Sequence, residues 1–257
     1  MATAYVMKRK AVSLALVFLV LCMGIYYELT LNKVSSVFCS TKEDVRLQDM
    51  YFNKWKDKSW ISLGDSITKP GAYQNNLKDI LGFSIIDNMG KSGQTMTSGL
   101  SHNSTYTLGK DIDYSKYDLA TIFIGTNDFR YNKKLGEIKT SNSKDFDENT
   151  FTGSYQLLIE SILKSNPNIN LVLITPTQRI KDGYDINFTN KTGSKLVDYV
   201  SVIKDLGEIY SLSVLDLYSE GGITKENISS FTNDGLHLND EGYKRISEKM
   251  YRFLLNI

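Results

Sequence analysis

Two widely separated segments of the 257-residue chain carry side chains that could act together in serine hydrolase chemistry. Asp234 stands three residues before His237, one of only two histidines, so one turn could supply a general base and the carboxylate that orients it. Far upstream, an apolar run ends abruptly at Gly64, Asp65 and Ser66. Each segment also has a structural interpretation: Ser66 could cap a helix, and Asp234 and His237 could form a pair at the start of the last helix.

Two further positions could stabilise the oxyanion of an acyl-transfer reaction. Gly93 lies in a glycine-dense loop, where the backbone can approach a substrate closely and offer its N–H group. Asn127 follows the most apolar run of the chain, and its side-chain amide can donate to a developing negative charge. Both residues would also suit ordinary turns. The second histidine, His102, lies in a loop rich in Ser, Asn and Thr, and we expect it to be a solvated loop residue.

Alternating apolar runs and helical patterns predict the elements that must position these residues. Uninterrupted apolar runs are typical of parallel strands buried on both faces, and helical spacing is found between them. Five strands separated by helices indicate a parallel sheet with helices on both faces, which is an α/β fold. The strands are predicted at 60–63, 83–86, 119–124, 169–174 and 213–217, and the helices at 71–81, 151–163, 194–210 and 240–255.

The candidate residues follow the ends of the predicted strands. Ser66 comes after the first strand, Gly93 after the second, Asn127 after the third, and Asp234 and His237 after the last. In open α/β sheets, ligands bind beyond the carboxyl ends of the strands. The topology therefore predicts that these side chains gather at one edge of the sheet.

The N-terminal region is typical of a targeting segment. A basic cluster at 8–10 precedes seventeen uncharged residues, 11–27, which are rich in Leu and Val. We predict a membrane anchor or signal peptide within residues 1–39, a polar stalk at 40–58 and a single domain at 59–257. The basic flank would remain on the cytoplasmic side, so the domain is expected to be extracytoplasmic, either membrane-anchored or secreted after cleavage.

Charge and cysteine usage exclude several classes of function. The formal net charge is +1 and no basic patch stands out, so we do not expect nucleic acid as a partner. Cys22 and Cys39 both precede the predicted domain, which therefore uses neither a disulfide nor a thiolate nucleophile. With two histidines and no evident ligand spacing, we also expect no metal site. The oligomeric state is left open.

Four blocks of the sequence, taken together, resemble the SGNH hydrolases, also called GDSL-type esterases or lipases. The blocks lie at 64–68, 88–95, 125–128 and 234–243, in the order of the Ser, Gly, Asn and His that name the family. Ile67 stands where Leu is usual in the first block. The resemblance spans residues 59–255.

This resemblance implies a three-layer α/β/α sandwich with a five-stranded parallel sheet, similar to flavodoxin. It implies that Ser66 is the nucleophile, His237 the base and Asp234 the group that orients the base. The oxyanion hole would consist of the Ser66 and Gly93 N–H groups and the Asn127 amide. The reaction would pass through an acyl-enzyme without a metal or another cofactor.

Family members act on several kinds of ester. The predicted outward-facing anchor favours a surface or extracellular carbohydrate as substrate, and the lack of a long apolar insertion favours a short acyl group, acetyl, over a long chain. Phe129 and Tyr131 are candidates to stack on a sugar ring. Their alternative role is the packing of a surface loop. An O-acetyltransferase on the same polymer, a lipid or thioester esterase, and a non-catalytic membrane-tethered binding module are the competing interpretations.

Overall fold

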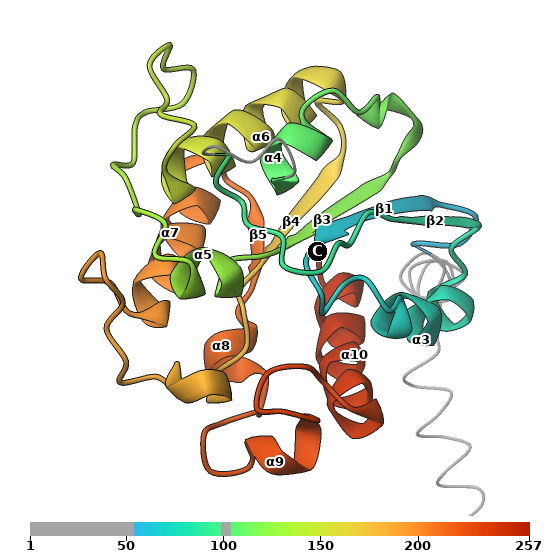
Figure 1. Ribbon diagram of the computed structural model, residues 1–257. Helices are drawn as coiled ribbons and strands as arrows, with labels where there is room; N and C mark the ends of the chain where they lie inside the picture. The colour runs from blue at the N-terminus through green and yellow to red at the C-terminus, as the bar shows by residue number, and fades with distance from the viewer. Residues whose placement is uncertain (1–53, 99–103) are drawn as a thin grey trace, which may run out of the picture. The chain divides into compact units, whose positions relative to one another are not determined.

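The computed structural model describes residues 54–98 and 104–257 (Figure 1). The predicted membrane segment at 11–27, the predicted stalk up to residue 53, and His102 lie outside these ranges. Within them, no helix is both long and apolar enough to cross a membrane.

Five parallel strands form one sheet in the order β2-β1-β3-β4-β5. The central strand β3 is buried along its whole length, because strands pair with it on both sides and helices cover both of its faces. This confirms the predicted parallel sheet. The strands are β1 (Ser59–Gly64), β2 (Ile85–Asn88), β3 (Leu119–Phe123), β4 (Asn170–Ile174) and β5 (Ser213–Leu215).

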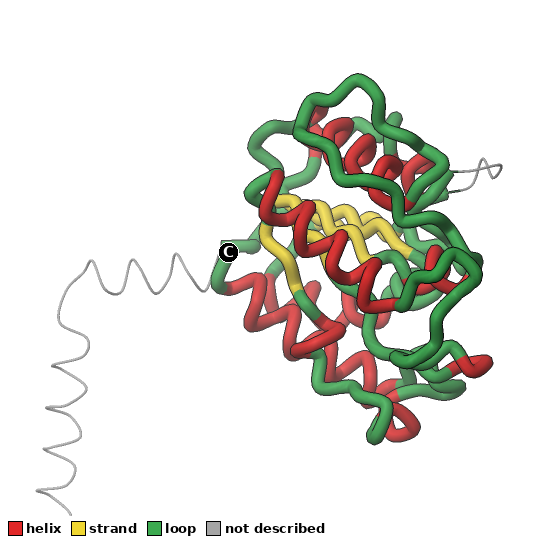
Figure 2. The backbone as a smooth tube through the Cα atoms, turned by 90° about the vertical axis from the view of Figure 1, so that its left-hand side faces the viewer, coloured by secondary structure: helices red, strands yellow, loops and turns green. Residues whose placement is uncertain are grey.

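Alternate residues of the strands point into two separate cores, one on each face of the sheet. Ile122 packs in the core beneath α4, α6 and α7, whereas its neighbour Phe123 packs in the core beneath α3 and α10. Figures 1 and 2 show the sheet between these two helical layers, which confirms the three-layer α/β/α sandwich. These helices are α3 (Ala72–Leu81), α4 (Thr105–Gly109), α6 (Phe151–Ser165), α7 (Leu196–Ile209) and α10 (Asp240–Leu255).

Shorter helical segments lie in the connections, and the sequence analysis did not predict them. They are η1 (Tyr114–Lys116), α5 (Thr126–Arg130), η2 (Lys181–Gly183), α8 (Leu217–Glu220) and α9 (Ile228–Phe231). The last predicted strand, 213–217, therefore ends at Leu215, because the Asp216 side chain accepts from the Ser219 N–H group and begins α8.

The second strand begins two residues later than predicted. Phe83 does not pair in the sheet but packs its ring against Trp55 and Trp60, at centroid distances of 5.5 and 5.4 Å. Trp55 itself is only 2% exposed, and its Nε1 donates to the Leu254 carbonyl at 2.8 Å. The predicted boundary between stalk and domain at residue 58 is therefore too late, since the folded unit already includes Trp55.

Candidate active site

A sharp turn after β1 presents Ser66 at the carboxyl edge of the sheet. A Cβ atom on Gly64 would lie 2.1 Å from the Thr68 hydroxyl oxygen and 2.7 Å from the Phe123 carbonyl oxygen, so a larger residue cannot occupy this position. The buried Asp65 carboxylate accepts the Ile67 N–H at 2.9 Å and holds the turn. Burial also raises the pKa of Asp65 to about 7.

His237 and Asp234 complete a hydrogen-bonded series with Ser66. The Ser66 Oγ lies 3.0 Å from His237 Nε2, and His237 Nδ1 lies 2.8 Å from Asp234 Oδ2. Asp234 Oδ1 accepts the His237 and Leu236 backbone N–H groups at 2.8 and 3.2 Å, which fixes the carboxylate within its own turn. This is the connectivity through which an imidazole can take a proton from a serine hydroxyl.

The start of α10 does not use this pair as its cap. The side chain of Asn239 is the N-cap and accepts the Gly242 N–H at 3.0 Å. The capping role that was the structural alternative for Asp234 and His237 is therefore filled by Asn239, while His237 contacts Ser66 and Asp234 contacts His237.

The proposed oxyanion donors converge on the same edge. Gly93 has φ +74, a conformation that favours glycine, and within the described chain neither its N–H nor that of Ser66 has an acceptor. Asn127 is almost fully buried in α5, and one N–H of its amide donates to the Gln94 carbonyl at 2.9 Å. The second N–H of that amide is available to a substrate oxygen.

Asp128 ties the Gly93 loop to α5. Its buried carboxylate accepts the Met96 N–H at 2.8 Å, and the Thr97 N–H and hydroxyl at 3.0 and 2.7 Å. Burial raises the pKa of Asp128 to about 6, although the hydrogen bonds from Thr97 and Met96 oppose the rise. The Gly93 loop and the helix that carries Asn127 are thereby held together.

Lys181, which was not among the residues predicted from the sequence, forms an ion pair and hydrogen bond with Asp234 Oδ2. Partial burial acts to raise the pKa of Asp234, but the hydrogen bonds from Lys181 and His237 outweigh it and hold that pKa well below its usual range. Lys181 lies a few residues beyond the carboxyl end of β4, the one strand end for which no candidate had been considered. This position beyond a strand end is the one feature of the sequence that could have pointed to Lys181.

The two aromatic candidates for substrate binding, Phe129 and Tyr131, have different environments in the structure. Phe129 is fully buried and makes edge-to-face contacts with Tyr184, Phe188 and Tyr199, so the prediction that it stacks on a sugar is wrong. Tyr131 is 47% exposed, and its hydroxyl lies 3.8 Å from where a Cβ on Gly93 would stand. Tyr131 therefore remains placed beside the candidate oxyanion hole.

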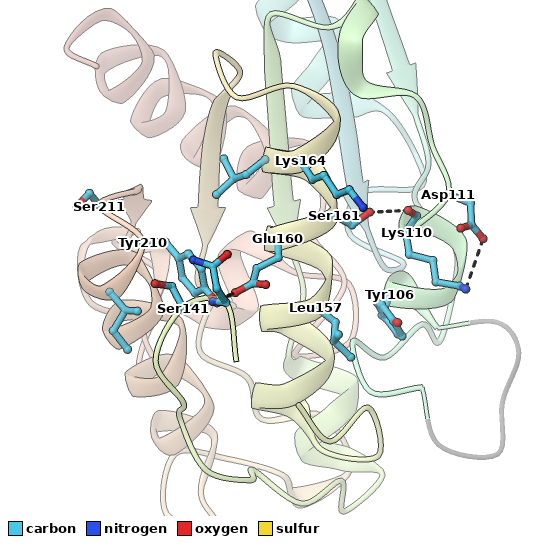
Figure 3. A pocket seen from close by; sticks show the side chains of 13 residues that line it. Tyr106, Lys110, Asp111, Ser141, Leu157, Glu160, Ser161, Lys164, Tyr210 and Ser211 are labelled. Carbon is cyan, nitrogen blue, oxygen red and sulfur yellow. Dashed lines mark hydrogen bonds and ion pairs between the residues drawn. The ribbon is translucent and has the colours of Figure 1, made fainter. Parts of the chain in front are cut away.

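The site is open to solvent, with the His237 side chain 38% exposed. A separate hollow of about 780 Å³ lies along α6, between α4 on one side and the end of α7 on the other (Figure 3). None of the candidate site residues lines it. In the described ranges, no group of three or more His, Cys, Asp or Glu side chains could hold a metal ion.

The chain is similar to known proteins in both sequence and fold. Residues 62–245 match the family model of the GDSL-like lipase/acylhydrolases. A protein of known structure from Lactobacillus plantarum is 26% identical, with a TM-score of 0.68 over 77% of this chain and 97% of its own. No curated protein matches the sequence.

Two further solved structures share the fold at lower identity. A lipase/acylhydrolase from Enterococcus faecalis is 20% identical, with a TM-score of 0.52 over 77% of this chain and 95% of its own. An acetyl xylan esterase is 23% identical, with a TM-score of 0.54 over 76% of this chain and 98% of its own.

Proposed function

The chain belongs to the GDSL-like lipase/acylhydrolase family and is a carboxylic ester hydrolase, and on this basis we propose that it removes acetyl groups from an extracellular carbohydrate. The observation that carries the proposal is the continuous series Ser66–His237–Asp234, with separations of 3.0 and 2.8 Å. An intact nucleophile, base and orienting carboxylate are the groups that acyl transfer requires.

The proposed reaction proceeds in two halves through an acyl-enzyme. His237 Nε2 takes the proton of the Ser66 hydroxyl while Oγ attacks the ester carbonyl carbon, and the Asn127 amide and the Ser66 and Gly93 N–H groups stabilise the oxyanion. The protonated His237 then gives its proton to the departing alcohol oxygen. In the second half, His237 takes a proton from a water molecule whose oxygen attacks the acyl carbon. The bond between that carbon and Ser66 Oγ then breaks, His237 returns the proton to Oγ, and the acid leaves.

A short acyl group on a polymer suits the surroundings of Ser66. The catalytic groups lie at an open surface, where a long chain of sugars can cross without entering a tunnel. The exposed ring of Tyr131 is placed beside Gly93, where it can contact a sugar. The acetyl xylan esterase with the same fold is consistent with such a substrate.

We also place the enzyme outside the cytoplasm, tethered or secreted. This part of the proposal depends on the basic cluster at 8–10 and the uncharged run at 11–27. Both lie outside the described residues.

The test measures acetate release from acetylated xylan, and p-nitrophenol release from p-nitrophenyl esters of increasing acyl length, by the full-length protein in detergent. We expect the acetyl esters to be the best substrates and Ser66→Ala to abolish release, because Ser66 is the nucleophile that lies opposite His237 in the described part of the chain. Equal rates in wild type and Ser66→Ala would refute the mechanism. A preference for long-chain or thioester substrates would instead favour the lipid or thioester alternative, and acetyl transfer to an added sugar would favour the transferase.

A further inference from the structure

Lys181 brings a positive charge to the carboxylate that orients the catalytic base. Its ammonium group binds Asp234 Oδ2, the same oxygen that lies 2.8 Å from His237 Nδ1. The other oxygen, Oδ1, is held by the backbone N–H groups of the turn itself. One carboxylate oxygen is therefore shared between a permanent cation and the imidazole that becomes a cation during catalysis.

The backbone around Lys181 is hydrogen-bonded to the turn that carries Asp234 and His237, and Arg179 connects it to the helix that carries Asn127. The Ile180 and Lys181 N–H groups donate to the Gly235 carbonyl, inside the acid–base turn, at 2.9 and 3.3 Å. The fully buried guanidinium of Arg179 donates to the Lys181 carbonyl at 3.4 Å and to the Thr126 hydroxyl at 2.9 Å. Thr126 begins the helix that carries Asn127. The backbone of Lys181 is therefore connected through hydrogen bonds both to this helix and to the turn of Asp234.

Other charged side chains belong to the segment that contacts this turn, but they bind elsewhere. Arg179 donates to the Thr126 and Lys181 carbonyls, and Asp182 pairs with Arg130 at 3.3 Å. Among the residues described, Lys181 is the one cation paired with Asp234 besides His237, and Ser66 contributes only a neutral hydroxyl. The acidic residues Asp240 and Glu241 open α10 a short distance along the chain, and neither forms an ion pair with the turn in the described structure. Lys181 therefore dominates the charge that Asp234 receives from outside the catalytic series.

We propose that Lys181 is a positioning residue for the catalytic pair, acting through Asp234 to set the lower pH limit of ester hydrolysis. This inference rests on the proposed roles of Ser66, His237 and Asp234. The Asp234 charge stabilises the protonated imidazole, whereas the Lys181 charge opposes it. With Lys181 in place, ester hydrolysis is therefore expected to extend to lower pH than without it.

The test compares pH profiles of kcat/KM for wild type, Lys181→Met, Lys181→Gln and Lys181→Arg with p-nitrophenyl acetate. Lys181 is 27% exposed, so the effect is that of a partly screened pair. We expect the rising limb of Lys181→Met to move up by about half a pH unit, a loss of about threefold in rate below the limb. The high-pH plateau should change by less than about twofold, since the turn still holds Oδ1.

The other variants separate charge from hydrogen bonding and from folding. Lys181→Gln keeps a donor without the charge, so it should shift like Lys181→Met, and Lys181→Arg should match wild type. Lys58→Met is a matched control, because Lys58 pairs with Asp118 at 2.9 Å near the start of β1 and β3, at the opposite edge of the sheet. Its profile should equal that of wild type.

A Lys181→Met limb that coincides with wild type, or a Lys181→Gln profile identical to wild type, would overturn the proposed electrostatic role. In 1 M salt, the expected shift should shrink, because screening weakens the cation in the wild type. If Ser66→Ala retained full activity, the catalytic assignment would fail instead, so the two failures are distinguishable.

Discussion

The buried carboxylate of Asp65 should make the stability of the domain fall as pH rises, and Asp65→Asn should remove much of that dependence. Asp65 is 2% exposed, and its Oδ1 accepts the Ile67 N–H at 2.9 Å. The amide oxygen of Asn can accept the same bond, so the substitution removes the ionisable group with little change of shape. The comparison therefore isolates the burial of a charge beside Ser66.

The magnitude follows from the pKa of Asp65, which burial raises from 3.8 to about 7. A raised pKa in the folded state means that the stability contribution is complete below pH 3.8 and is lost as pH rises through 7. A shift of about three units corresponds to about 4 kcal/mol, of which about 3 kcal/mol is lost between pH 5 and pH 8. This is an upper limit, since local relaxation and water entry reduce the cost of a buried charge.

The assay is unfolding by urea and by heat, followed by circular dichroism, at intervals between pH 5 and pH 8. Near pH 5 the two proteins should differ least. Between pH 5 and pH 8, the free energy of unfolding of Asp65→Asn should rise relative to that of wild type by up to about 3 kcal/mol. This corresponds to about 10 °C in Tm. Asp79→Asn is the control, because Asp79 is exposed on α3, and it should follow wild type at every pH.

Parallel stability curves for wild type and Asp65→Asn would refute this reasoning. They would mean that Asp65 is ionised in the folded protein at the same pH as in the unfolded chain. A difference that grows as pH falls would contradict the sign of the effect and point to a salt bridge in place of desolvation.

Two further substitutions test the oxyanion hole and the edge of the core. Asn127→Ala should lower kcat by about 10²–10³ with a smaller change in KM, because the amide would act mainly in the transition state; an unchanged kcat in steady-state kinetics would remove Asn127 from the mechanism. Trp55→Ala should destabilise the domain by about 3–5 kcal/mol in urea unfolding, since the ring is buried against Phe83 and its Nε1 donates to the Leu254 carbonyl. A loss below about 1 kcal/mol would mean that residues before β1 do not contribute to the core.

Much of the architecture could be predicted because the central strands are apolar on both faces. The runs 119–124 and 171–174 are almost entirely apolar and are buried in the structure, and glycine or proline marks where they stop. Edge strand β2 has no comparable pattern: Ile85 is exposed, while Phe83, before the strand, is buried against Trp55. Its register depends on contacts with residues distant in sequence, so the prediction missed it by two residues.

The error over Phe129 has a geometric cause. The sequence around Asn127 predicts a surface loop, whereas Thr126–Arg130 form the five-residue helix α5. Residues two apart on a helix point about 200° from each other, and residues four apart lie on nearly the same side. An Asn127 directed at the site therefore turns Phe129 into the core and brings Tyr131 back toward Gly93.

No local motif identifies Lys181, and only its place beyond the end of a predicted strand could have pointed to it. It pairs with a carboxylate 53 residues further along the chain, and the pairing depends on the buried Arg179 and on the Gly235 carbonyl. Neither contact follows from spacing or composition. The Ser66 and His237 positions were different, because each lies in a short motif at a predicted strand end.

The bond between Trp55 and Leu254 brings the two ends of the domain together at the amino edge of the sheet, away from the edge that carries Ser66. An enzyme immobilised through either end should therefore keep its catalytic edge turned away from the support. The same proximity suits circular permutation, in which a short linker joins the ends and the chain is opened at an exposed loop near residue 142.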